Sequence, residues 1–341
     1  MPPFITPLAV DTWDASYRWR EGGRLRDLTI DATWERVADA LAGTSDGDYR
    51  RDLIDAFSSW QLLLDDRILA EAGTGGWNGN DDMFVAVLNI AAFVRAPCTP
   101  RASIDLPAIE RIAALAVRAL DDAATWHPTP PPLRFGIGVM GVADALSLMN
   151  IQYENPLSRN IAMRVSRALA HGCLAASVDL AQVRGPHTPC DGAWRQRAAE
   201  RGMPEGLIEK SVRFGLRHTA LTAIAPRKKL ARFANCVADA LDPLGGDRDS
   251  TSAHVAANGY ATNVRRHLLG AVAEPGPDRF ANVVSQLELR GAMQPWIDAR
   301  IDYPVRVLVP PDEAAVRAWS ALAADLELGP FTWSMHAASP A

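Results

Sequence analysis

The 341-residue sequence has few lysines, few cysteines and no long apolar run. Only three of its 35 basic residues are lysines, and its net charge is −5. An acidic chain without a sequence-wide basic field is not expected to bind DNA, RNA or an anionic membrane through overall charge. Four cysteines are too few for a disulfide-stabilised scaffold of this length.

The sequence also lacks segments that direct a chain to or across a membrane. The longest apolar run, residues 84–94, is shorter than the roughly 18 residues that a membrane-spanning helix needs, and it contains Asn89. The first residues show no basic stretch followed by an apolar run, so no secretory signal is predicted. We therefore expect a soluble, reduced, cytoplasmic protein.

Hydrophobic periodicity and capping residues predict more helix than strand. Helices are expected over 31–41, over 105–122, from Pro156 to near Gly185, and from Pro311 onward. Short strands are expected over 84–94, 219–225 and 305–309. This pattern predicts an α+β fold that is mainly α. We expect a helical region over 1–80 and a small sheet within 81–341, packed as one compact unit.

Three glycines match the G-x-G-x-x-G pattern of dinucleotide-binding folds, Gly136, Gly138 and Gly141. The prolines of 128–132 leave little room for a strand before them, and no β-α-β unit with a later acidic residue is evident. We therefore interpret the motif as a tight turn that leads into a helix over 142–149.

Histidine and cysteine occur close together at His171, Cys173, His187 and Cys190. The first two lie two positions apart on a predicted helix and point to different sides of it. The remaining pair is too few for a structural zinc site, which takes four ligands. We predict no metal site.

The only adjacent lysines, Lys228 and Lys229, follow Arg227 directly after the expected strand 219–225. A cationic turn after a strand suits phosphate, because charge-assisted hydrogen bonds add to those from backbone amides. The alternative is a solvated basic turn without a ligand.

Several stretches of the chain recur in the order of one known family. They are Trp13 to Ala38 (W…YR…TW-x-R-V-A), Arg67 to Thr74 (R-I-L-A-E-A-G-T), 88–94 (L-N-I-A-A-F-V), 136–144 (G-I-G-V-M-G-V-A-D), 215–226 (G-L-R…L-T-x-I-A-P) and 294–298 (Q-P-W-I-D). Together they resemble the large subunit of ribonucleotide reductases, most closely the adenosylcobalamin-dependent class. The resemblance implies N-terminal helices followed by roughly the second half of the family's ten-stranded α/β barrel.

The same resemblance implies that the radical site is missing. Between Thr74 and Leu88, family members carry the first half of the barrel, a redox cysteine and the cysteine that becomes the thiyl radical. This chain is much shorter there and has no cysteine. The family's second redox cysteine falls at Met83, whose thioether cannot form a disulfide. None of the four cysteines, Cys98, Cys173, Cys190 and Cys236, falls on a catalytic position of the pattern.

The family's phosphate loop, A-P-T-G-T, is also replaced. Here it reads Ala225-Pro226-Arg227-Lys228-Lys229, and His218 stands after Arg217 where the family has asparagine. A histidine there could act as an acid or base near neutral pH. The candidate ligand-binding residues are Arg217, His218, Ala225, Pro226, Arg227, Lys228 and Lys229.

The leading hypothesis is a non-catalytic, shortened relative, a pseudoenzyme that uses no adenosylcobalamin and has no catalytic residue. A half-barrel exposes a sheet edge that must be covered by a helix, shortened, or paired with another chain, so we expect a homodimer or docking to a full-length reductase. In place of a protein partner, the ligand of such a protein could be a nucleotide or another phosphate compound. The alternative is an enzyme with new chemistry in a reshaped pocket around His218 and 227–229.

Overall fold

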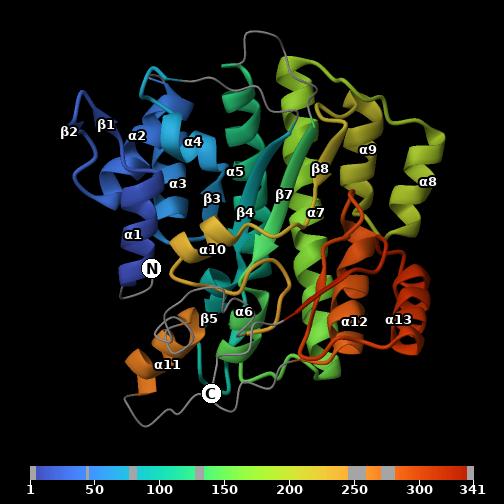
Figure 1. Cartoon of the computed structure of the whole chain (residues 1–341). Helices are drawn as coiled ribbons and strands as arrows, with labels where there is room; N and C mark the ends of the chain where they lie inside the picture. The colour runs from blue at the N-terminus through green and yellow to red at the C-terminus, as the bar shows by residue number, and fades with distance from the viewer. Residues whose placement is uncertain are drawn as a thin grey trace.

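Helices make up most of the computed structural model (Figure 1), which describes residues 5–43, 46–76, 83–126, 134–244, 259–269 and 281–335. The α-helices are α1 (Pro7–Ser16), α2 (Ile30–Ala42), α3 (Gly47–Ser58), α4 (Asp66–Glu71), α5 (Leu106–Ala124), α6 (Val142–Leu148), α7 (Pro156–Arg184), α8 (Gly192–Glu200), α9 (Glu205–Phe214), α10 (Lys228–Phe233), α11 (Tyr260–Leu269), α12 (Val283–Met293) and α13 (Glu313–Asp325). In the described ranges no helix is both long and apolar enough to cross a membrane.

The strands are short. They are β1 (Arg20–Glu21), β2 (Arg24–Leu25), β3 (Leu62–Leu64), β4 (Phe84–Asn89), β5 (Val94–Arg95), β6 (Ser103–Ile104), β7 (Arg134–Met140), β8 (Ala220–Thr222), β9 (Val305–Val307) and β10 (Trp333–Met335). The described residues also form two 3₁₀ helices, η1 (Ile90–Phe93) and η3 (Gln294–Trp296). The four helices expected from periodicity are present as α2, α5, α7 and α13.

The central sheet has the strand order β3-β4-β7-β8, in which β4, β7 and β8 run parallel and β3 is antiparallel. Helix α5 connects β4 to β7 and packs on both, and α7 packs on β8. Both helices lie behind the sheet in Figure 1. Within the described residues the sheet stays open and forms no closed barrel, which confirms the α+β, mainly helical prediction.

The glycine motif lies in a strand, so its interpretation as a turn was wrong. Gly136 and Gly138 are part of β7, which lies beside β4 in a parallel β-α-β arrangement. A Cβ atom at Gly138 would overlap the carbonyl oxygen of Ala223, whose carbon lies 3.5 Å away. Only Gly141 is a turn, with φ of 70°, and it caps α6 as expected for the helix. These glycines allow another segment to lie directly on the sheet.

That segment is the chain that follows β8, residues 223–241, and it covers the face of the sheet opposite α5 and α7. The backbone nitrogen of Gly141 donates to the carbonyl oxygen of Ala238 at 2.8 Å, at the end of β7. In Figure 1 the segment crosses in front of the sheet and includes α10. Val85 and Val87 of β4 are buried. Both faces of the sheet are therefore closed.

Both edge strands of the central sheet are also covered by other parts of the chain, as the edge of a half-barrel requires. All three residues of β3 have no exposed surface. At the other edge, the Asp298 carboxylate accepts hydrogen bonds from the backbone nitrogens of Leu221, at 2.8 Å, and Thr222, at 3.1 Å. The backbone nitrogen of Ala299 donates to the carbonyl oxygen of Thr222 at 3.1 Å. The two edges of the central sheet are therefore covered within the described residues, and association with another chain stays a prediction.

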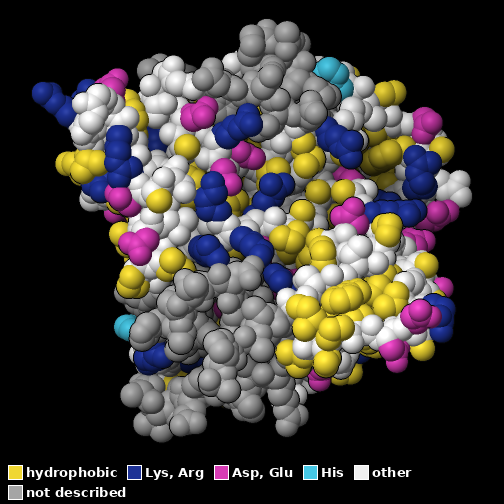
Figure 2. Space-filling view, viewed as in Figure 1, with side chains coloured by type: hydrophobic (Ala, Val, Ile, Leu, Met, Phe, Trp, Pro, Cys, Tyr) yellow, Lys and Arg dark blue, Asp and Glu magenta, His cyan; other side chains and the backbone are white. Residues whose placement is uncertain are grey.

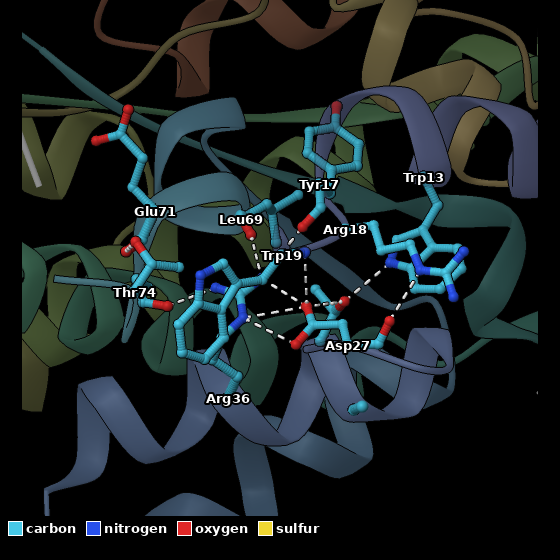
Figure 3. A network of polar contacts seen from close by, with 12 residues as sticks. Trp13, Tyr17, Arg18, Trp19, Asp27, Arg36, Leu69, Glu71 and Thr74 are labelled. Atoms are coloured by element: carbon cyan, nitrogen blue, oxygen red, sulfur yellow. Dashed lines mark hydrogen bonds and ion pairs between the residues drawn. The ribbon is translucent and has the colours of Figure 1, made fainter. Parts of the chain in front are cut away.

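The N-terminal helices are tied together by a buried ion pair between Arg36 and Asp27 (Figure 3), with Nη2 and Oδ2 3.0 Å apart. Arg36 also donates to the carbonyl oxygens of Tyr17 at 3.2 Å, Leu69 at 3.0 Å and Ala72. One guanidinium thus satisfies carbonyls of α4 and of the end of α1. Arg36 belongs to the motif TW-x-R-V-A, so this motif has a structural role in packing the N-terminal helices together.

The main apolar core contains residues from both sides of residue 80. Phe233 of α10 contacts Trp34 and Trp60, with ring centroids 5.4 and 5.1 Å apart. The segment that covers the sheet is therefore anchored in the N-terminal aromatic cluster. The division at residue 80 into two regions stays a prediction.

Replacing Gly138 by alanine tests the close contact between β7 and residue 223. We expect Gly138→Ala to lower the free energy of unfolding by about 1–3 kcal/mol, because the added methyl group must displace the Ala223 backbone. Urea unfolding followed by circular dichroism measures it. Gly206→Ala in α9 is the control, since no atom lies within 4 Å of its Cβ position. Equal stability of the two variants would contradict the contact.

Candidate functional site

Met83, where the resemblance places the family's second redox cysteine, lies directly before β4 on the covered face of the sheet. A Cβ atom on Gly136 would lie 3.2 Å from the Met83 Cε and 3.6 Å from the Cβ of Ala223. Met83 is partly buried and packs against the main core. This position is thus occupied by a thioether packed on glycine and alanine.

All four cysteines are free, and two of them are buried. Burial raises the pKa of the Cys173 thiol well above its usual value. Burial also raises the pKa of Cys190 to about 11. Both are therefore neutral thiols at physiological pH, and neither has the character of an activated nucleophile.

His218 is fully buried between the helices behind the sheet. Its Nδ1 lies 2.9 Å from the hydroxyl of Ser177 on α7, and its Nε2 lies 3.3 Å from the carboxylate of Asp121 on α5. The imidazole packs on Phe135 with ring centroids 4.5 Å apart. Both ring nitrogens therefore have partners inside the protein.

Asp121 is the centre of this network. Besides His218, its carboxylate pairs with Arg184 and with Arg217, whose Nε lies 3.2 Å from Oδ1. Burial raises the pKa of Asp121, but hydrogen bonds from His218 and Arg184 outweigh it and lower the pKa to about 2. The carboxylate is thus ionised at neutral pH and balances two arginines.

Burial lowers the pKa of His218, and the opposing hydrogen bond to Asp121 does not compensate. The imidazole is therefore neutral, with Nε2–H donating to Asp121 and Nδ1 accepting from the Ser177 hydroxyl. The Ser177 oxygen in turn accepts the backbone N–H of His218 at 3.2 Å. Ser, His and Asp are joined here, but all three side chains are buried and fully engaged, so the arrangement positions β8 and exposes no acid or base.

The candidate residues at 225–229 lie elsewhere. Helix α10 begins at Lys228, and the backbone nitrogen of Arg227 donates to Asp239 at 2.7 Å. Lys228 and Lys229 are exposed, and the Lys229 Nζ lies 3.5 Å from the carboxylate of Asp66. Figure 2 shows Lys and Arg side chains gathered over α10.

The seven candidate residues therefore do not form one site. Arg217 and His218 contact α5 and α7, whereas Arg227 and Lys229 contact Asp239 and Asp66. Sequence reasoning did not identify the partners Asp121, Ser177 and Arg184. The one sequence feature that could have indicated this network is Asp121, which is an aspartate on the apolar face of the helix α5.

Removing the charge of Asp121 should destabilise the fold strongly. We expect Asp121→Asn to lower the free energy of unfolding by about 2 kcal/mol, because the partly exposed Arg184 and Arg217 then lose their buried counter-ion. Chemical denaturation measures the change. The control, Asp179→Asn, breaks an exposed pair with Lys210 and should cost less than about 1 kcal/mol. Similar losses in both variants would show that Asp121 is not a central partner.

Comparison with known proteins agrees with the fold. The family described as "Ribonucleotide reductase, barrel domain" matches residues 84–294. A ribonucleoside-diphosphate reductase subunit alpha of Synechocystis is 28% identical over 166 residues, covering 41% of this chain and 21% of that protein. The ribonucleoside-diphosphate reductase large chain of Encephalitozoon cuniculi is 28% identical over 171 residues, covering 47% of this chain and 22% of that protein.

A vitamin B12-dependent ribonucleoside-diphosphate reductase of Mycobacterium tuberculosis is 26% identical over 151 residues, covering 41% of this chain and 19% of that protein. The chain thus matches about a fifth of the length of these relatives. Because the family match covers more than half of the chain, the protein belongs to the ribonucleotide reductase large-subunit family through its barrel domain. The predicted family is confirmed, while the predicted adenosylcobalamin-dependent class stays a prediction.

Proposed function

We propose that this protein is a shortened, cytoplasmic member of the reductase family, of adenosylcobalamin-dependent descent, that does not reduce ribonucleotides and instead binds a phosphorylated ligand. The observation that supports this most is the covered face of the sheet. Residues 223–241 lie against this face, where the Ala223 backbone contacts Gly138 and the carbonyl of Ala238 accepts the N–H of Gly141.

The absence of thiols on that face supports the same proposal. Reductase chemistry needs a thiol that carries a radical and a second pair that supplies electrons. The described residues around Met83 offer a thioether, glycine and alanine instead. A radical generated by adenosylcobalamin would find no acceptor thiol among them, so the residues present do not fit this cofactor. We propose no role for adenosylcobalamin.

The alternative, a new enzyme around His218 and 227–229, has weaker support. Both nitrogens of the His218 ring are engaged in hydrogen bonds, and its side chain has no exposed surface. A general acid or base must reach the substrate directly or through one water. We therefore favour a binding protein over an enzyme.

An activity assay tests the non-catalytic proposal. The purified chain, incubated with adenosylcobalamin, dithiothreitol and ribonucleoside di- or triphosphates, should yield no deoxyribonucleotide above the blank by chromatography. A full-length B12-dependent reductase is the positive control. Met83→Cys should be equally inactive, because one restored thiol supplies neither radical nor electron pair. Product formation by the unmodified chain would refute the proposal.

The proposed phosphate site is the start of α10. Lys228 and Lys229 are exposed there, beside the half-buried Arg227, and basic side chains surround them in Figure 2. Lysine ammonium groups bind phosphate as point charges. Such binding should weaken with salt, because exposed charges are screened over about 10 Å at 0.1 M ionic strength.

Titration calorimetry with inorganic tripolyphosphate and with ATP at 20 and 200 mM salt tests this site. We expect binding at low salt that weakens at least fivefold in Lys228→Gln/Lys229→Gln. Arg195→Gln/Arg213→Gln removes the same charge from the α8–α9 region and is the control. If neither ligand binds at low salt, or if both double variants lose affinity equally, the phosphate site is wrong.

A protein partner is the second candidate, because exposed apolar side chains gather in the C-terminal part of the chain. Leu308 is 55% and Val309 is 73% exposed, and Trp333 and Met335 are also exposed. Figure 2 shows a broad apolar area around α12 and α13. Apolar patches of this kind are typical of interaction surfaces.

Light scattering after gel filtration distinguishes the partner hypotheses. We expect a mass of two chains for a homodimer, or co-elution with a full-length reductase for docking. Leu308→Ser/Val309→Ser should reduce either association, because it removes exposed apolar side chains without touching the core. A single monomer peak at all concentrations, with and without the reductase, would contradict both.

A further inference from the structure

A helical hairpin, residues 191–214, projects from the body of the protein between α7 and β8. It contains α8 and α9, at the right of Figure 1. An antiparallel bridge closes its base, where the backbone nitrogen of Leu216 donates to the Thr188 carbonyl at 2.8 Å and Thr188 donates back at 3.0 Å. The hairpin rests on α7 through its own small apolar cluster. It is thus a defined unit with a fixed base.

A cavity of about 250 Å³ lies between this hairpin, α7, β8 and η3. Its α7 wall is apolar and includes Ala170, Cys173 and Leu174. Two half-buried tryptophans also line it, Trp194 on α8 and Trp296 on η3. The cavity is smaller than the roughly 300–1,000 Å³ of pockets for drug-sized ligands, so it suits a ligand built on one small ring system.

Two arginines, Arg197 on α8 and Arg201 at its C-cap, line the same cavity. Both are exposed, and within the described parts of the chain neither side chain has an ion pair or hydrogen bond. Like charges four positions apart on a helix are destabilising by about 0.2–0.5 kcal/mol. This helix therefore keeps two unbalanced charges at the cavity.

The one carboxylate in the lining is already engaged. Asp298 accepts the backbone N–H groups of Leu221 and Thr222 at the edge of β8. His218 also borders the cavity, but its ring is buried against Asp121. The cavity thus combines aromatic walls with two arginines and one carboxylate, and that carboxylate is hydrogen-bonded to backbone N–H groups and forms no ion pair with either arginine.

We propose that this cavity binds a small ligand in which a planar aromatic ring carries a carboxylate or a phosphate group. The ring packs against Trp194 and Trp296, and the anionic group pairs with Arg197 and Arg201. Guanidinium groups match both anions with two parallel hydrogen bonds, and aromatic rings prefer offset or edge contacts with tryptophan. This site is separate from the proposed phosphate site at Lys228 and Lys229.

Ligand-observed NMR with the full chain tests the proposal, using four probes of similar size. Naphthoate and naphthyl phosphate carry both features, naphthalenemethanol lacks the charge, and decalin carboxylate lacks the aromatic ring. We expect one or both aromatic anions to bind at least tenfold more tightly than the other two probes. The comparison between them identifies carboxylate or phosphate as the preferred group.

Two variants locate the binding. Arg197→Gln/Arg201→Gln should lower the affinity for the aromatic anions at least tenfold. Trp194→Leu should make the affinity for the aromatic anions no higher than that for decalin carboxylate. Arg195→Gln/Arg213→Gln removes the same charge from the same hairpin outside the cavity and should change affinity less than twofold. Circular dichroism confirms that each variant is folded. Because Arg197 and Arg201 are exposed, their loss should leave folding intact.

Three results would overturn the proposal. One is the absence of binding by either aromatic anion at millimolar concentration and low salt. Another is equal loss of affinity in the cavity variant and the control, which indicates general charge attraction. The third is equal binding of naphthalenemethanol, which indicates a purely apolar cavity. None of these results bears on the site at α10, where Lys228→Gln/Lys229→Gln gives a separate readout.

Discussion

The rest of the structure depends on how the small parallel sheet is covered on both faces. Parallel sheets are stable mainly when both faces are buried. Helices α5 and α7 cover one face, and the chain's own residues 223–241 cover the other. This covering requires that backbone lie against backbone, which Gly138 allows. A face covered in this way supports the proposal that ligands bind at the periphery of the fold.

The charged network around the buried Asp121 serves the same arrangement. Asp121, Arg184, Arg217 and His218 join α5, α7 and the entry to β8, where an apolar contact alone would leave the strand free to shift. Buried ion pairs add little net stability, because desolvation offsets their attraction, but they restrict which arrangement satisfies every charge. We interpret this network as the device that holds β8 in place beside β7.

Much of the fold could be predicted from local pattern, whereas the candidate site could not. Helices α2, α5 and α7 follow from apolar periodicity and caps such as Asn155. Strand β7 was missed because its glycines are typical of turns in isolation, and only the contact with Ala223 explains them. The partners of His218 lie 41 and 97 positions away, so no local pattern could place them together. The cavity beside α8 likewise depends on segments that are distant in sequence.

The Asp298 carboxylate has a consequence for the protein in concentrated solution. It accepts hydrogen bonds from the N–H groups of two successive residues of β8, of which a further strand could use at most one, and its side chain remains exposed to water. A neighbouring molecule can add a strand there only by displacing this carboxylate first. Asp298 and the backbone of Ala299 thus cover this edge of the sheet, where other proteins use a lysine, a proline or a β-bulge against edge-to-edge pairing.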